Sequence, residues 1–177
     1  FSTKDAKGYG IHPSLLTYYH KNGVLDRIAP GFYKVHDAEL NVPFEWEDLI
    51  LTTLSIPNGI ICLISALALY ELSDQIPRKF WIAIANDRHP PKRQGVRYVR
   101  MRNMELGRTT IQLGEFTLPI FDKERTVVDS FRHLSIEIAI KSLQDYLKQD
   151  NPDFNKLSEY AQKLRTHIQP YILSLTT

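Results

Sequence analysis

The fold of the N-terminus is decided by residues 10–35, which read GIHPSLLTYYHKNGVLDRIAPGFYKV. Pro13 suits the first turn of a helix, because its φ is already helical and its missing N–H would be unpaired there in any residue. Asn22-Gly23 supplies the left-handed stop that ends many helices. The pattern therefore predicts a helix over residues 13–21 that begins after His12.

The flanking segments complete a small module. Upstream, Ser2 or Thr3 can cap a short helix over residues 4–7, because a hydroxyl satisfies free amides of the first turn. Downstream, residues 24–28 and 32–35 read as two strands around a Pro-Gly turn. The resulting order of helix, turn, helix and hairpin is that of a winged helix.

The second helix of such a module enters the major groove of DNA, and cations of the hairpin, or wing, contact phosphates. The spacing predicts that Leu15, Leu16 and Tyr19 face the core. The candidate DNA-binding residues are the outward residues of this helix and the cations of the wing: Ser14, Thr17, Tyr18, Lys21, Arg27 and Lys34. A solvated helix face without a partner is the alternative, but a basic hairpin directly after the helix favours DNA binding.

We expect two domains, a winged helix-turn-helix over residues 1–38 and a larger α/β domain over residues 39–177. The larger domain begins with an acidic amphipathic stretch, residues 44–54. A segment apolar on nearly all sides follows at residues 60–72, and we expect a helix enclosed in the core there. Strands are predicted at residues 80–85, 96–101, 109–111 and 116–120, and helices at residues 124–134, 136–148 and 154–165. The predicted fold class is α+β, with a winged helix-turn-helix followed by a small mixed sheet and a helical C-terminus.

Composition restricts the class of protein. The formal net charge of +2 is too small to indicate a nucleic-acid partner by itself, so the distribution of charge along the chain matters more than its sum. Cys62 is the single cysteine and lies in an apolar run, which indicates a buried thiol and a reducing compartment. The longest apolar run, residues 59–70, is too short to span a membrane. We expect a cytoplasmic protein without a membrane anchor.

The sequence shows no clear catalytic constellation. The six histidines are dispersed without metal-ligand spacing, and no glycine-rich phosphate loop is present. Asp122, Glu124 and Asp129 around Arg125 could hold Mg²⁺ in a nuclease. The commoner explanation is a helix start, at which acids favour the dipole and Arg125 pairs with Asp129 one turn later. We therefore expect no enzyme activity, no cofactor and no metal, with a nuclease as the least favoured alternative.

Residues 88–102 form the most basic stretch, with six cations and no acid. Exposed cations of this kind can simply protect a sheet edge from mispairing. They can also contact DNA or RNA, with an aromatic ring for stacking, or an acidic protein surface. The candidate residues of this surface are Arg88, Lys92, Arg93, Arg97, Tyr98, Arg100 and Arg102.

Several segments resemble the AbiEi family, the antitoxins of type IV toxin–antitoxin systems. At the N-terminus these are residues 1–6, 10–15 and 21–35. Further along, residues 62–72, 76–84 and 122–129 look like family segments in family order. The winged helix of that family usually begins with one further helix, so we expect that the first helix of the module is missing from this sequence.

The resemblance implies a transcriptional autorepressor that binds inverted repeats of its own promoter, with two copies on the DNA. It further implies that the C-terminal domain counteracts a nucleotidyltransferase-like toxin without a stable complex, as part of abortive infection and phage defence. The competing hypothesis is a winged helix that binds a protein partner rather than specific DNA.

Overall fold

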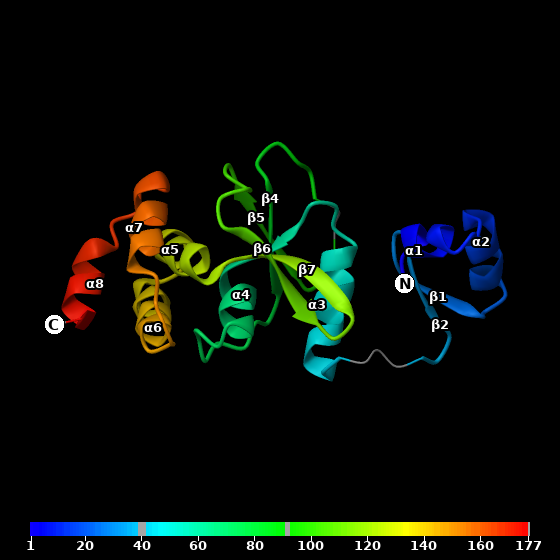
Figure 1. Cartoon of the computed structure of the whole chain (residues 1–177), viewed down its shortest axis with the longest axis horizontal. Helices are drawn as coiled ribbons and strands as arrows, with labels where there is room; N and C mark the ends of the chain where they lie inside the picture. The colour runs from blue at the N-terminus through cyan, green and yellow to red at the C-terminus, as the bar shows by residue number, and fades with distance from the viewer. Residues whose placement is uncertain (39–41, 91–92, 177) are drawn as a thin grey trace. The chain divides into compact units, whose positions relative to one another are not determined.

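The N-terminal module folds as two short helices followed by a hairpin. The computed structural model describes residues 1–38, 42–90 and 93–176. Its first elements, shown in blue in Figure 1, are α1 (Thr3–Gly8), α2 (Pro13–Lys21), β1 (Leu25–Ala29) and β2 (Phe32–Val35). This is the predicted order of a winged helix-turn-helix.

Local chemistry explains the helix boundaries. The Ser2 side chain accepts a hydrogen bond from the Asp5 amide while the Asp5 carboxylate accepts one from the Ser2 amide, a capping box that starts α1. His12 caps α2, because its Nδ1 accepts the amide of Ser14. Gly31 sits in the turn of the hairpin at φ +78°, a conformation that other residues adopt only with strain.

A small core joins the helices to the hairpin. Ala6 of α1, Leu16 of α2, and Leu25 and Tyr33 of the hairpin are buried together. The prediction that Leu15 and Tyr19 also face the core is wrong in part, because their exposed fractions are 40% and 37%. The core of this module has four buried side chains, so Leu16 alone is enough to cover it from α2. Leu15 and Tyr19 lie at the edge of this core.

The larger part of the chain contains a mixed sheet. Among the described residues it has five strands in the order β5-β4-β3-β7-β6. β3 pairs antiparallel with β4 and parallel with β7, and β4 pairs parallel with β5. The strands are β3 (Ile60–Ile61), β4 (Phe80–Ala85), β5 (Val96–Met101), β6 (Arg108–Leu113) and β7 (Phe116–Phe121).

The segment over residues 60–72 differs from its prediction as one helix. Ile60 and Ile61 form the central strand β3, and the helix α4 (Leu63–Leu69) begins only after Cys62. Both isoleucines are fully buried, as is Cys62. A run apolar on all sides suits a central strand as well as an enclosed helix, so hydrophobicity could not separate the two.

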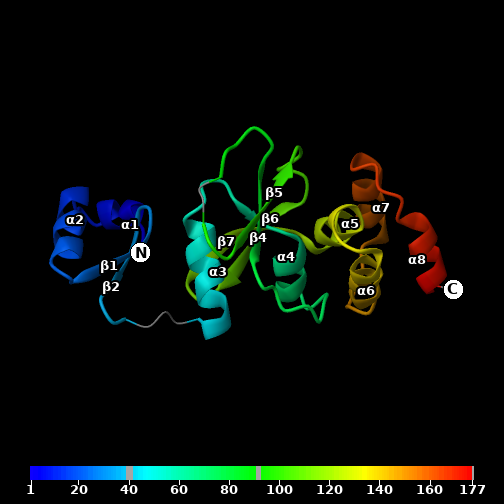
Figure 2. The same ribbon diagram turned by 180° about the vertical axis from the view of Figure 1, so that it is seen from behind.

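The remaining helices are α3 (Phe44–Leu54), α5 (Lys123–His133), α6 (Ile136–Leu147), α7 (Phe154–Lys163) and α8 (Gln169–Thr176). α5 packs against α4, α6 and α7, and α6 also contacts α8. Both views show α5 and α6 next to α4, with α7 and α8 beyond them (Figures 1 and 2). The helix α8 was not predicted from the sequence.

The described residues divide into two compact units. The first, the N-terminal unit, comprises Phe1–Pro57 with Gln112–Thr117, and the second comprises Asn58–Ile111 with Leu118–Thr177. The predicted domain boundary lies between residues 38 and 39. Residues 39–41 are outside the described part of the chain, so this boundary stays a prediction. The chain is α+β, with a winged helix-turn-helix, a small mixed sheet and a helical C-terminus, as the sequence predicts.

Candidate nucleic-acid interfaces

The outward face of α2 presents the four residues predicted to contact DNA. Ser14, Thr17, Tyr18 and Lys21 are all exposed, and Tyr18 has an exposed fraction of 59%. The rings of Tyr18 and Tyr19 meet edge to face, with centroids 5.6 Å apart. The helix thus offers a cation, an aromatic ring and two hydroxyls on one accessible surface.

The two hydroxyls of this face already have local partners. The Ser14 hydroxyl lies 2.8 Å from His12 Nδ1, and Thr17 donates to the carbonyl of Pro13 at 3.2 Å. A hydroxyl that donates once can still accept hydrogen bonds. Ser14 and Thr17 can therefore accept from base amino groups, whereas Lys21 supplies the positive charge.

The wing does not bring its two predicted cations together. Lys34 lies opposite Asp26 in the hairpin register, whereas Arg27 lies opposite Tyr33. Successive residues of a strand point to opposite faces, so the two cations lie on different faces of the ribbon. The Lys34 ammonium donates to the carbonyl of Ala38 at 3.2 Å, and its side chain is half-buried. Arg27, which is exposed, is the better placed of the two for a phosphate.

Asp26 adds a negative charge to the wing. It pairs with His36 at 3.1 Å, and this hydrogen bond, together with Asp37 nearby, raises the pKa of His36. The carboxylate opposite Lys34 further offsets that cation's charge. The wing therefore depends mainly on Arg27 for positive charge.

The predicted basic stretch of the second unit is spread over several places. Arg88 and Arg93 are exposed beside the loop after β4, Arg97 and Arg100 lie on β5, and Arg102 follows that strand. Lys92 lies outside the described residues. The stretch is therefore distributed along one edge of the sheet, because β5 is the terminal strand on that side.

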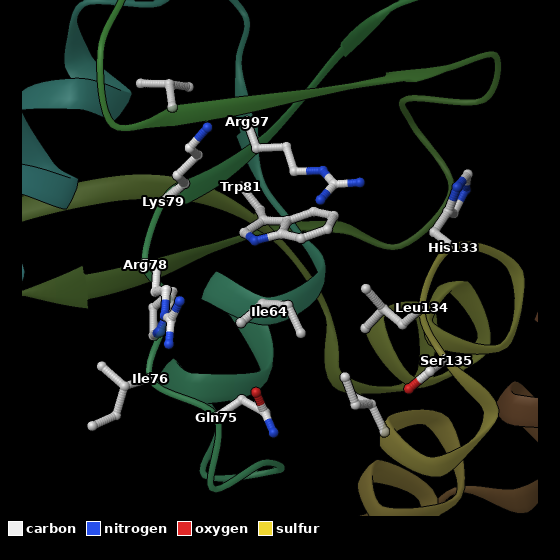
Figure 3. A pocket seen from close by; sticks show the side chains of 13 residues that line it. Ile64, Gln75, Ile76, Arg78, Lys79, Trp81, Arg97, His133, Leu134 and Ser135 are labelled. Atoms are coloured by element: carbon white, nitrogen blue, oxygen red, sulfur yellow. The ribbon is translucent and has the colours of Figure 1, made fainter.

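Arg97 belongs to a pocket of about 760 Å³, which we call the Trp81 pocket (Figure 3). Its guanidinium Cζ lies 4.1 Å from the centroid of the Trp81 ring, a cation–π contact between neighbouring strands. Figure 3 shows Trp81 between Arg97 and Ile64, with Leu134 across the pocket. The charged lining residues are Arg78, Lys79 and Arg97, and the imidazole of His133 also lines the pocket.

Arg100 and Arg102 line a second pocket of about 440 Å³, which we call the arginine pocket. His133 lines both pockets, so the two adjoin at this residue. The other charged residues of the arginine pocket come from α5, the end of α7 and the loop after it: Arg125, Arg132, Lys163 and Arg165. Neither pocket has a carboxylate among its described lining residues.

Tyr98 does not join these residues. It pairs with Ile82 in the register, one position away from the Trp81–Arg97 pair, and so points to the other face of the sheet. Its hydroxyl is buried without a hydrogen-bond partner in the described part of the chain, and burial raises its pKa. The ring that contacts Arg97 of this stretch is that of Trp81, which the sequence did not single out.

The buried carboxylate of Asp129 fixes two arginines that line the arginine pocket. Arg125 donates its Nε to Asp129 at 2.6 Å, and Arg132 donates to the other oxygen of Asp129 at 2.7 Å. Arg125 also donates to the carbonyls of Asn103 and Leu106. Asp129 is 2% exposed and has both oxygens occupied by arginines, which agrees with a structural role.

The other carboxylates of the nuclease alternative are occupied as well. Asp122 caps α5 by accepting the amide of Arg125, and its other oxygen lies 3.1 Å from the Lys156 ammonium. Glu124 accepts from the Tyr146 hydroxyl at 2.7 Å and pairs with Lys156 at 3.0 Å. The described residues contain no group of three or more His, Cys, Asp or Glu side chains suited to a metal ion.

Sequence reasoning missed the residues that come to these pockets from distant segments. Trp81 was interpreted only as part of a buried strand, and His133, Lys163 and Arg165 had no signal beyond their charge. Trp81 and Arg97 share a face because they are opposite each other in the pairing of β4 with β5, and no pattern within either segment indicates this. Every helix in the described ranges is also too short or too polar to cross a membrane.

Comparison with known proteins concerns the N-terminus. Residues 1–36 match a family described as "Transcriptional regulator, AbiEi antitoxin". No curated protein matches the chain. The matched residues contain α1, α2, β1 and β2, so the similarity covers the helix-turn-helix and its wing. Because the N-terminal part of this chain is similar to that family, the match supports a role as transcriptional regulator and antitoxin.

Proposed function

We propose that the chain is the antitoxin and transcriptional autorepressor of a type IV toxin–antitoxin operon. In this proposal α2 reads inverted repeats in the promoter, with one copy of the chain on each half-site. The proposal is carried by one observation: the exposed face of α2 lies in a helix-turn-helix with a wing, and that whole module matches a family of regulators.

The contacts have separate roles. Lys21, and Arg27 of the wing, would neutralise phosphates, because each ammonium or guanidinium group is exposed and can release condensed counterions from DNA. Tyr18, Ser14 and Thr17 would meet base edges in the major groove. Lys34 would contribute less than Arg27, since it donates to a backbone carbonyl and faces Asp26.

The antitoxin half of the proposal assigns relief of toxicity to residues 39–177. The partner is a nucleotidyltransferase-like toxin encoded next to this chain, and a stable complex between the two is not required. Co-expression tests this half: growth of cells that express the neighbouring toxin should recover when the chain is present. Persistent growth arrest despite soluble, folded chain would contradict it.

The DNA-binding half is tested with the region upstream of the chain's own gene. In anisotropy titrations at low salt, the full chain should prefer a duplex with the intact inverted repeat over one with scrambled repeats. Lys21→Ala should weaken binding to both duplexes and lower the slope of log affinity against log salt by about one unit per copy bound. Lys148→Ala, which removes an exposed cation from the end of α6, is the matched control and should change neither value.

A second candidate function is favoured by exposed apolar side chains on the same unit. Leu15, Tyr18 and Tyr19 of α2 and Val24 and Val35 of the hairpin are all exposed. Such a surface also suits a protein partner. If Leu15→Ala abolishes co-purification of a second protein while operator affinity is absent in the unmodified chain, the protein-binding role replaces the DNA-binding one.

A further inference from the structure

We propose that the Trp81 pocket and the arginine pocket together bind a single-stranded nucleic acid, with an unpaired base in the first pocket and the adjoining phosphates in the second. This goes beyond the DNA-reading role of α2 and does not depend on it. The proposal rests on three observations of the second unit: the charge of the pockets, their shape and composition, and their connection through His133.

The pockets concentrate positive charge, and most of their cations meet no carboxylate within the described residues. Among the described residues, Arg78, Lys79, Arg97, Arg102 and Arg165 take part in no ion pair. The arginines that have a partner share Asp129, so one carboxylate balances two guanidinium groups. Like charges held together in a recess repel one another, and a polyanion relieves that repulsion.

The Trp81 pocket has the composition of a base-binding site. Arg97 covers one face of the Trp81 ring, so the base would stack on the aromatic surface that Arg97 leaves open. Ile64, Leu134 and Ile138 supply apolar contacts in the same pocket (Figure 3). A volume of about 760 Å³ lies within the range of pockets that enclose small organic ligands. Proteins that bind single strands combine such a stacking ring with a cationic groove.

The shape favours an unpaired strand over a duplex. A base can enter a recess and stack on a side chain only when it is not paired and stacked within a helix. A convex helix such as α2 suits the groove of a duplex, whereas these two pockets are concave. Because His133 lines both, a strand with its base at Trp81 continues directly to Arg100, Arg102 and Arg132.

Hydrogen bonds within the chain hold the residues around the pockets in place before any ligand binds. The amide of Trp81 donates to the Ser65 hydroxyl at 2.9 Å, and its carbonyl accepts from Cys62. Arg132 is fixed by Asp129, and Arg100 by the carbonyl of Asn86. A preformed site loses less conformational freedom on binding, which favours affinity.

The test uses the full chain and fluorescein-labelled oligonucleotides of about twelve nucleotides, a length within the site sizes of single-strand binders. Matched RNA and DNA strands, and the duplex of the same sequence, are titrated at low salt. We expect the single strands to bind more tightly than the duplex. The RNA and DNA arms identify the preferred sugar, and tight binding of either supports the proposal.

Variants locate the site. Trp81→Leu should weaken single-strand binding about tenfold, because stacking of one base on an aromatic ring is lost. Arg102→Gln and Arg165→Gln are exposed substitutions that preserve the fold, and each should reduce the salt slope by about 0.7. Trp81→Phe should retain most of the affinity, and Lys148→Gln all of it.

A spectroscopic measurement checks the position of the base. The chain has two tryptophans, so Trp46→Phe leaves Trp81 as the only one. Saturating single strand should then quench the remaining fluorescence. The proposal fails if the fluorescence is unchanged, or if the duplex binds as tightly as the strands and Trp81→Leu has no effect. It also fails if poly-glutamate displaces the strands at equal charge concentration, since the site would then fit an acidic protein.

Discussion

The two units carry their positive charge in opposite ways. In the helix-turn-helix module of the N-terminal unit, Lys21 and Arg27 stand on a convex, exposed surface, and the module has a core of four buried side chains. In the second unit, cations converge on two recesses, and a buried carboxylate, Asp129, holds two of them. A convex helix can enter a duplex groove and a recess can enclose a single base, so we propose a different kind of nucleic acid for each unit.

The two units also differ in how much their charged residues contribute to stability. Arg125→Met should have the largest effect, lowering the free energy of unfolding by about 3–5 kcal/mol, because removal of one partner of a buried pair leaves the other poorly compensated. It also leaves the carbonyls of Asn103 and Leu106 without their donor. Urea unfolding followed by tryptophan fluorescence measures the change.

Asp5→Asn provides the matched change in the first unit. The Asp5 carboxylate is exposed, and its hydrogen bonds within the described residues go to Ser2 in the capping box. The unfolding midpoint should therefore move far less than for Arg125→Met. Equal losses from the two substitutions would remove the distinction between buried and exposed charge.

Two glycines with the same backbone angle, one in each unit, differ in what surrounds them. Gly23 and Gly107 both have φ +71°. A Cβ at Gly23 would meet nothing within 4 Å, whereas at Gly107 it would lie 2.6 Å from the Cβ of Arg125. Gly23→Ala should therefore cost about 1–2 kcal/mol for the left-handed conformation alone. Gly107→Ala should cost about 1–3 kcal/mol more than that, because the overpacked segment must shift.

Thermal unfolding of the two alanine variants gives this difference directly. The expected order is the unmodified chain, then Gly23→Ala, then Gly107→Ala as the least stable. A Gly107→Ala variant as stable as Gly23→Ala would show that the contact between this turn and α5 is loose.

The sequence could predict the exposed face of α2 in the first unit, but not how the pockets of the second unit are assembled. The face of α2 consists of residues within eight positions of one helix, so capping and helical spacing were enough to place Ser14, Thr17, Tyr18 and Lys21 outward. The pockets join β4, β5, α5 and α7, and no local rule connects Trp81 to His133 or Arg165. The central strand β3 was missed for the same reason, since its identity depends on pairing with β4 and β7.

The smallest effect that we predict is the change of folding stability with pH, and its sign is opposite in the two units. Burial is the main cause that lowers the pKa of His133, helped by Arg132 and Arg125 and opposed by Asp129. Its folded pKa thus lies below the unfolded value of about 6.5. The unfolded chain binds more protons between these two values, so stability falls as the pH falls through this window.

His36 behaves in the reverse way. Its raised pKa means that its pairing with Asp26 stabilises the fold below about pH 6.5 and is lost as the pH rises through the folded pKa. His133→Gln should reduce the loss of stability in mild acid, and His36→Gln should slightly increase it. Unfolding midpoints between pH 5 and 7.5 show whether the two variants diverge; parallel shifts would contradict the assignment.

The most direct test of two separate surfaces is a double comparison on the full chain. Lys21→Ala and Trp81→Leu are each titrated with the operator duplex and with the single strand. We predict that Lys21→Ala weakens binding of the duplex alone and that Trp81→Leu weakens binding of the single strand alone. If either substitution weakens both ligands to the same extent, the two ligands do not have separate binding residues and the account is wrong.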